Sequence, residues 1–159
     1  MPMMLMRSLL VAGAVVTVGL GARVAHAEPV AGAYDVKYDL TANNCSSELL
    51  KFARGELRID IKGTTMSVDI ERVPMMTGAP TKTGKITAKS RPQGGHTAVM
   101  GMDGVFSVAG RVQNGLLSLV FVGEYYTAAG HKPLCTQSWN ISGVRKDDAP
   151  PPPKDPPKK

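Results

Sequence analysis

The two cysteines are the residues of this sequence with the greatest capacity for chemistry. Cys45 and Cys135 are the only cysteines in 159 residues. A cysteine serves as a nucleophile or a metal ligand when His, Asp or further Cys residues lie at a suitable spacing. Neither has such neighbours, since the nearest histidine, His131, precedes Cys135 in a bare His-x-x-x-Cys spacing. The pair therefore predicts a disulfide, and chain entropy assigns a closed loop of about 90 residues a stabilisation of about 4–5 kcal/mol.

The remaining reactive side chains form no catalytic or metal-binding motif. The two histidines beyond the first 27 residues, His96 and His131, lie in no His/Cys/Asp cluster. Most carboxylates alternate with apolar residues, which is typical of solvated strand faces. The sequence contains no Gly-x-Ser-x-Gly elbow, no phosphate-binding glycine loop and no His-Glu-x-x-His motif. We therefore predict a protein that is not an enzyme and that holds no metal and no cofactor.

Methionine is the residue type that most suggests ligand binding. The chain has nine, and the methionine side chain adapts to irregular apolar surfaces. One interpretation is that the mouth of a small apolar-ligand site is formed by Met75, Met76, Met100 and Met102 with Phe106 and Tyr125. The alternative is that these side chains fill the core and anchor loops.

The first 27 residues predict an export signal. Arg7 gives a positive start, residues 8–20 are almost wholly apolar, and Ala25-His26-Ala27 is a small-x-small cleavage pattern. The apolar run is too short to span a bilayer. We expect cleavage after Ala27 and an exported protein, periplasmic or extracellular, that is not transmembrane. An oxidising compartment also favours the Cys45–Cys135 disulfide.

The charge of the chain excludes a nucleic-acid partner. The formal net charge is +6, and removal of Arg7 and Arg23 leaves +4 for residues 28–159. Nucleic-acid binding needs a dense basic face with stacking aromatic residues. The excess here is weak and lies partly at the C-terminus. We expect a monomer.

Alternating apolar and polar residues predict a β-rich domain. Tyr34, Val36 and Tyr38 alternate with charged residues, and so do Leu57 and Ile59. On this pattern eight segments are expected to be strands: 34–41, 56–62, 65–71, 84–91, 96–102, 105–113, 116–126 and 134–145. Asn114-Gly115 is a strong hairpin signal, because a type I′ turn needs positive φ at both positions.

Two segments depart from the strand pattern. Residues 45–54 carry a capping serine, an apolar side at Leu49, Leu50 and Phe52, and a terminating Gly55, which predict a short helix. Residues 74–83 predict a loop that forms a lid or a rim.

Eight sequential antiparallel strands favour an all-β fold closed into a small barrel. Closure removes both exposed sheet edges, and the disulfide would tie the first strand to the last. A two-sheet β-sandwich is the alternative. The domain is expected at residues 28–146, followed by a disordered Pro/Lys-rich tail at 147–159.

The domain resembles the lipocalin-like, or calycin, barrels. The resemblance rests on Gly32-Ala33-Tyr34 before the first strand, on the meander, and on Arg145 or Lys146 closing the last strand. It implies that Tyr34 plugs one barrel end and that a basic side chain lies across it, with Trp139 grouped among the barrel-closing residues. It also implies a barrel that holds a small apolar ligand. Tyr34 stands where the family usually has Trp.

Three functions follow as expectations. The first is non-catalytic binding of a small hydrophobic ligand in the barrel or at its mouth. The second is an envelope-associated interaction or inhibitor module that uses its outer face and its basic tail, with an anionic envelope polymer as one partner. The third is a structural role that the sequence does not specify.

Overall fold

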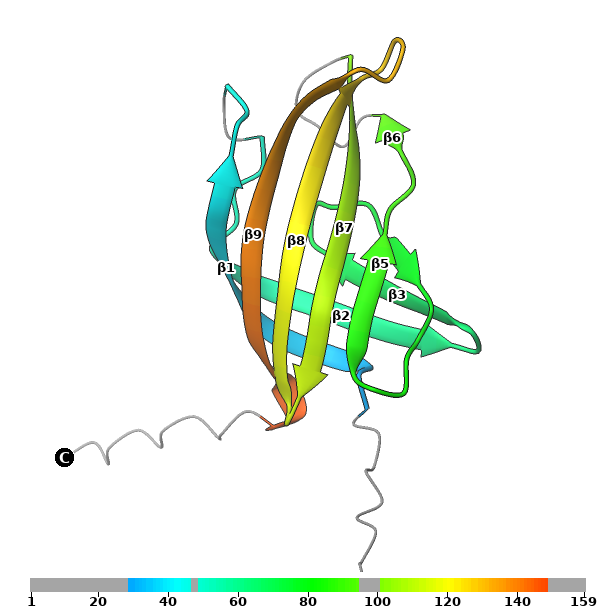
Figure 1. Cartoon of the computed structure of the whole chain (residues 1–159). Coiled ribbons are helices and arrows are strands. Elements are labelled where there is room, and N and C mark those ends of the chain that lie inside the picture. Colours follow the sequence, from blue (N-terminus) through cyan, green and yellow to red (C-terminus); the bar gives the residue numbers. More distant parts are fainter. Residues whose placement is uncertain (1–28, 47–48, 95–100, 149–159) are drawn as a thin grey trace, which may run out of the picture.

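The computed structural model describes residues 29–46, 49–94 and 101–148. Its regular structure is β apart from one short 3-10 helix (Figure 1). The elements are β1 (Gly32–Asn43), β2 (Arg54–Lys62), β3 (Thr65–Ile70), β4 (Met76–Gly78), β5 (Lys85–Lys89), β6 (Gln93–Gly94), β7 (Met102–Gln113), β8 (Leu116–Thr127), β9 (Pro133–Arg145) and the 3-10 helix η1 (Lys146–Asp148). The predicted all-β class is confirmed.

The strands form one antiparallel sheet that closes on itself. The order is β5-β4-β3-β2-β1-β9-β8-β7-β6, and β5 also pairs with β7. Eight strands therefore make a ring, and the two-residue β6 continues the sheet beside the first residues of β7. The predicted antiparallel barrel of about eight strands is confirmed, and the alternative, a two-sheet sandwich, is not the observed fold.

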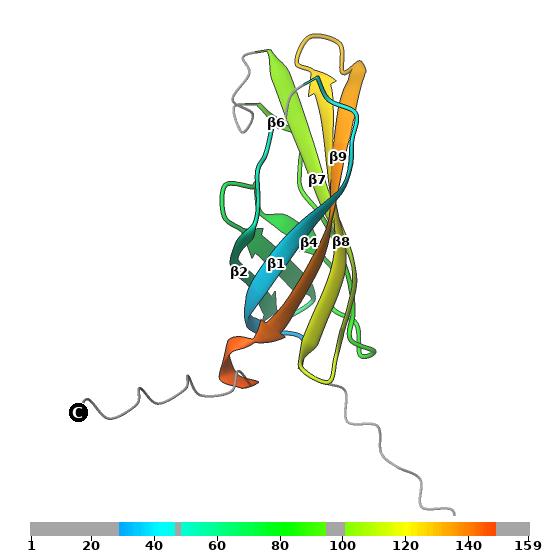
Figure 2. The same cartoon turned by 90° about the vertical axis from the view of Figure 1, so that its left-hand side faces the viewer.

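Strand length differs greatly around the ring. β7, β8 and β9 have 12 or 13 residues and stand side by side, whereas β2 and β3 are shorter and cross behind them at a steep angle (Figure 1). β1 belongs to both groups, because its first half pairs with β2 and its residues from Tyr34 to Asn43 pair with β9 (Figure 2). The far ends of β7–β9 thus extend beyond the closed ring, and we call this the disulfide end. The opposite end, where residue 29 and η1 lie, is the base.

The alternating pattern places one face of each strand in the core. Leu57 and Ile59 of β2 and Val68 of β3 have no exposed surface, while the charged residues between them face solvent. Asn114 and Gly115 have φ of 53° and 74°, as the predicted β7–β8 turn requires. The interior is rich in rings, and its largest fully buried side chains are Trp139, Tyr34, Tyr125, Phe106 and Phe121.

The predicted helix at residues 45–54 is wrong in the described part of that segment. Residues 49–53 are irregular and Arg54 already begins β2. The reason is a tertiary contact: Leu50 forms backbone hydrogen bonds with the side chain of Gln137 on β9 instead of with a helical turn. Residues 47 and 48 lie outside the described part.

Three other boundaries differ from the sequence prediction. The expected loop at 74–83 contains the three-residue strand β4. Residues 147 and 148, assigned to the tail, belong to η1. Of the expected strand at 96–102, residues 96–100 lie outside the described residues, as do the signal segment 1–27 and residues 149–159 of the expected tail.

Candidate functional site

The base of the barrel is closed by an interaction between its first and last long strands. Tyr34 on β1 is fully buried, and its hydroxyl donates a hydrogen bond to the Val30 carbonyl at 2.7 Å. The Arg145 guanidinium lies over the Tyr34 ring, 5.5 Å from its centroid, and its Nη2 donates to the Tyr34 hydroxyl at 3.0 Å and to the Pro29 carbonyl. The chain entering the barrel is therefore fixed to the strand that leaves it.

The glycine of the Gly-x-aromatic sequence has a conformational role at this end. Gly32 has a φ of 152°, which a residue with a side chain rarely adopts, and a Cβ there would meet Nε of Arg145 at 3.5 Å. The Arg145 side chain thus lies directly against the Gly32 backbone.

Aromatic rings form a continuous cluster through the interior. Trp139 stacks on Phe121 at 5.1 Å between centroids, Phe121 stacks on Phe106 at 6.0 Å, and Phe106 meets Tyr125 edge-to-face at 6.0 Å. These four side chains have at most 1% exposure. Trp139 pairs with Leu40 of β1, six residues along β9 from the Tyr34–Arg145 pair, so it lies in the core and not beside Tyr34 and Arg145.

Phe52 completes the cluster from outside the strands. It belongs to residues 49–53, a segment we call the strap. Its ring stacks on Tyr38 at 4.8 Å and meets Trp139 and Phe121 edge-to-face at 5.5 and 5.9 Å. The Arg72 guanidinium lies 5.5 Å from the Phe52 centroid, and its Nη2 donates to the Lys51 carbonyl at 3.1 Å.

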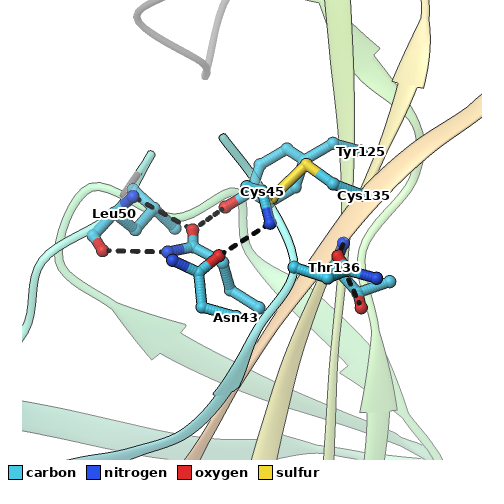
Figure 3. Close-up of a disulfide and its surroundings, with 8 residues drawn as sticks. Asn43, Cys45, Leu50, Tyr125, Cys135 and Thr136 are labelled. Atoms are coloured by element: carbon cyan, nitrogen blue, oxygen red, sulfur yellow. Dashed lines mark hydrogen bonds between the residues drawn. A yellow bond between two sulfur atoms is a disulfide. The ribbon is translucent and has the colours of Figure 1, made fainter. Parts of the chain in front are cut away.

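The disulfide and a buried glutamine join the strap region to β9 (Figure 3). Cys45 and Cys135 are bonded, with sulfur atoms 2.09 Å apart. Gln137 has no exposed surface, and its Oε1 accepts hydrogen bonds from the Tyr125 hydroxyl at 2.9 Å and the Leu50 N–H at 3.2 Å. Its Nε2 donates to the Leu50 carbonyl at 3.5 Å. Burial raises the pKa of Tyr125, so this hydroxyl remains a donor at neutral pH.

The residues predicted to form a ligand mouth have different environments. Met76 is fully buried, whereas its neighbour Met75 is 58% exposed. Met102 is partly buried against the core, and Phe106 and Tyr125 lie within it. Met100 lies outside the described residues. Among the five that the structure describes, Phe106 and Tyr125 are in ring contact with each other.

A groove of about 930 Å³ lies on the outer face near the base. It crosses β2, β1, β9 and β8, of which β1, β9 and β8 lie towards the viewer at the lower end of Figure 2. Its floor contains the cross-strand pair Leu116 and Val144, which are 56% and 38% exposed. The next pair on the same face, Ser118 and Ser142, also lines a second hollow of about 450 Å³ over β7–β9, so the two hollows adjoin.

Small side chains explain the depth of this outer face. The two serines lie between Arg111 on β7 and Lys37 on β1 in one cross-strand row, so short hydroxyl groups separate two long cations. The outer faces of β2 and β3 differ, because they carry charged residues, including Glu56, Arg58, Asp60, Lys62 and Asp69. Sequence reasoning read β8 as apolar on both faces but did not identify the groove, which depends on pairing between distant strands.

An ion-pair cluster forms one wall of the groove. Lys146 Nζ lies 2.5 Å from Glu56 Oε2 and 3.5 Å from Asp35 Oδ1. The hydrogen bond from Lys146, assisted by Arg58, lowers the pKa of Glu56, and the same bond with the Asp35 charge raises the pKa of Lys146. Both shifts favour the charged forms of Glu56 and Lys146. Because they are solvated, we treat them as recognition groups and not as a source of stability.

The described residues form no metal-ligand cluster and no membrane-spanning helix. No group of three or more His, Cys, Asp or Glu side chains is placed to hold a metal ion. The same part of the chain has no helix long and apolar enough to cross a bilayer. His131 lies in the β8–β9 turn with a φ of 49°, and His96 is outside the described part.

Comparison with protein-family models, curated proteins and solved structures finds no match to this chain.

Proposed function

We propose that this is a non-catalytic interaction module of an exported compartment, and that the groove over β2, β1, β9 and β8 takes an extended segment of a partner protein. The observation that carries the proposal is the groove itself, with the exposed pair Leu116 and Val144 in its floor. Large apolar side chains side by side in a surface hollow are a common feature of protein contact sites. The disulfide supports export, because such bonds persist in oxidising compartments.

The charges of the groove favour a protein segment over an anionic polymer. Its rim carries Lys37, Arg54 and Lys146 but also Asp35 and Glu56. Two carboxylates would repel a uniform polyanion, whereas a peptide with one or two apolar side chains flanked by charges of both signs matches floor and rim together. The lysines of the expected tail then add long-range attraction for an acidic partner surface.

Site-specific photo-crosslinking in the producing cell tests this proposal. A photoreactive amino acid at position 116 should give a discrete protein adduct that disappears when Val144→Asp is added. The matched control is position 61 on β2, where Ile61 is also exposed but does not line the groove. Equal adducts at 116 and 61, or none at 116, would reject the groove as a protein contact site.

A second candidate function is binding of a small apolar ligand in the interior. It is supported by the ring cluster of Phe52, Phe106, Phe121 and Trp139 and by the polar pair Tyr125–Gln137 beside it. Apolar linings with a few placed polar groups are typical of ligand pockets. Native mass spectrometry of the exported protein, isolated under mild conditions, should then show a bound small molecule; its absence from every preparation counts against a resident ligand.

A further inference from the structure

We propose that the Phe52 ring occupies a binding site from which it is displaced, and that the site takes a planar aromatic compound carrying an adjacent hydrogen-bond donor and acceptor. The proposal rests on the second candidate function above.

The Phe52 ring fills a space that is walled by other aromatic rings. The Tyr38 ring stacks on the Phe52 ring, and Trp139 and Phe121 meet the Phe52 ring edge-to-face. Tyr38, Trp139 and Phe121 belong to β1, β9 and β8, whose pairing with one another does not involve the strap. Removal of Phe52 therefore leaves a flat slot with rigid aromatic walls, and stacked and edge-to-face geometries both favour a planar aromatic occupant.

The strap lies outside the regular secondary structure. Residues 49–53 belong to no strand or helix, and Phe52 itself is only partly buried. Among the bonds that hold the segment are Tyr38 N–H to the Ala53 carbonyl, Arg72 to the Lys51 carbonyl, and the Gln137 amide to Leu50. A segment outside the paired strands opens at a lower free-energy cost than the strands themselves.

The strap covers a polar group, the side-chain amide of Gln137. Gln137 uses Oε1 and Nε2 to hold the carbonyl and the N–H of Leu50, two residues before Phe52. When Leu50 moves away, the same amide presents one acceptor and one donor beside the slot, and the Tyr125 hydroxyl keeps its orientation. A buried amide without partners is costly, so a ligand that fills the slot gains most if it carries a matching donor–acceptor edge, as a lactam does.

Binding of 2-quinolinone, a bicyclic aromatic lactam, tests the proposal, with naphthalene as the probe that lacks the polar edge. The readout is the indole resonance of Trp139, the single tryptophan of the chain, in NMR titrations of the full exported protein. Because only the open fraction binds, loosening the strap should tighten apparent affinity. We expect Arg72→Gln to bind the lactam about threefold to tenfold more tightly than the wild type, and Phe52→Ala more tightly still.

Arg58→Gln is the matched control, since Arg58 is an exposed arginine on β2 that does not touch the strap. It should bind as the wild type does, and naphthalene should bind more weakly than the lactam throughout. Two results overturn the proposal and are distinguishable. If no variant, including Phe52→Ala, shifts the Trp139 resonance, the interior is not a ligand site and the second candidate function fails with it. If Phe52→Ala binds but Arg72→Gln and Arg58→Gln both match the wild type, ligand binding stands and displacement of Phe52 is wrong.

Discussion

The Arg145 guanidinium lies over the Tyr34 ring and donates a hydrogen bond to its hydroxyl at 3.0 Å, although the two residues are 111 positions apart. This contact joins the beginning of β1 to the end of β9 at the base. Since β1 and β9 pair from Tyr34–Arg145 to Asn43–Gln137, the contact ends the seam at which the first and last long strands meet.

Substitution of Arg145 should open this end of the seam. Arg145→Met removes the hydrogen bonds to Tyr34 and Pro29 and the cation–π contact, and we expect a loss of about 2–3 kcal/mol in the free energy of unfolding in urea. Lys146→Met is the control, because that side chain forms only solvated ion pairs, and its effect should be smaller. Equal effects would show that the contact does not fix the base.

Loss of the disulfide should cost more than either change. Cys45 and Cys135 are separated by 90 positions, and the chain-entropy model assigns a loop of this size about 4–5 kcal/mol. The double variant Cys45→Ser/Cys135→Ser should therefore unfold at a markedly lower denaturant midpoint than the oxidised protein. Reduced wild-type protein should match the variant. A midpoint equal to that of the oxidised form would mean that the unfolded chain is already compact near these residues.

Gln137 and Tyr125 should show strong energetic coupling. Gln137→Leu leaves the Tyr125 hydroxyl and the Leu50 N–H without their acceptor, at a cost of about 2–3 kcal/mol. Tyr125→Phe in the same chain removes one of these stranded donors, so the double variant should lose less than the sum of the two single variants. Additive losses in a double-mutant cycle would contradict the shared hydrogen bond.

Alkaline pH should destabilise the protein through Tyr38. Burial, with a smaller contribution from the Glu71 charge, raises the pKa of Tyr38 from 10.0 to about 12. The folded state therefore keeps a proton that the unfolded chain releases near pH 10. The stabilisation is complete below that pH and is lost as pH rises towards 12. Tyr38→Phe should flatten the fall in unfolding free energy over this interval, and an unchanged pH profile would contradict the assignment.

The sequence predicted the long elements well because their pattern is set by burial on one face. β3 alternates throughout, and Trp139 and Ile141 of β9 point inward as expected; in β2 Leu57 and Ile59 follow the pattern but Ile61 is exposed. β4 was missed because three residues are too few to show a period. The strap was misread as helical because its leucines and Phe52 also suit a helix, and the competing partner, the Gln137 amide, lies 87 positions away.

The candidate sites were predictable only in part, for the same physical reason. The Tyr34–Arg145 contact is the arrangement that the lipocalin-like resemblance implies for one barrel end, and its residues were named on that ground. No sequence pattern indicated that the Arg72 guanidinium lies over the Phe52 ring, since Arg72 lies in a turn after β3 with a φ of 67°. The outer groove depends on the register that brings Leu116 beside Val144, and register between distant strands is not written in local periodicity.

The Cys45–Cys135 bond encloses every strand from β2 to β8 within one covalent ring. A protease that cuts a single surface turn between these positions, such as the one at Asn114-Gly115, releases no fragment, because both new ends stay tethered through sulfur. In an environment rich in proteases, a nicked molecule therefore keeps its full mass and all of its strands.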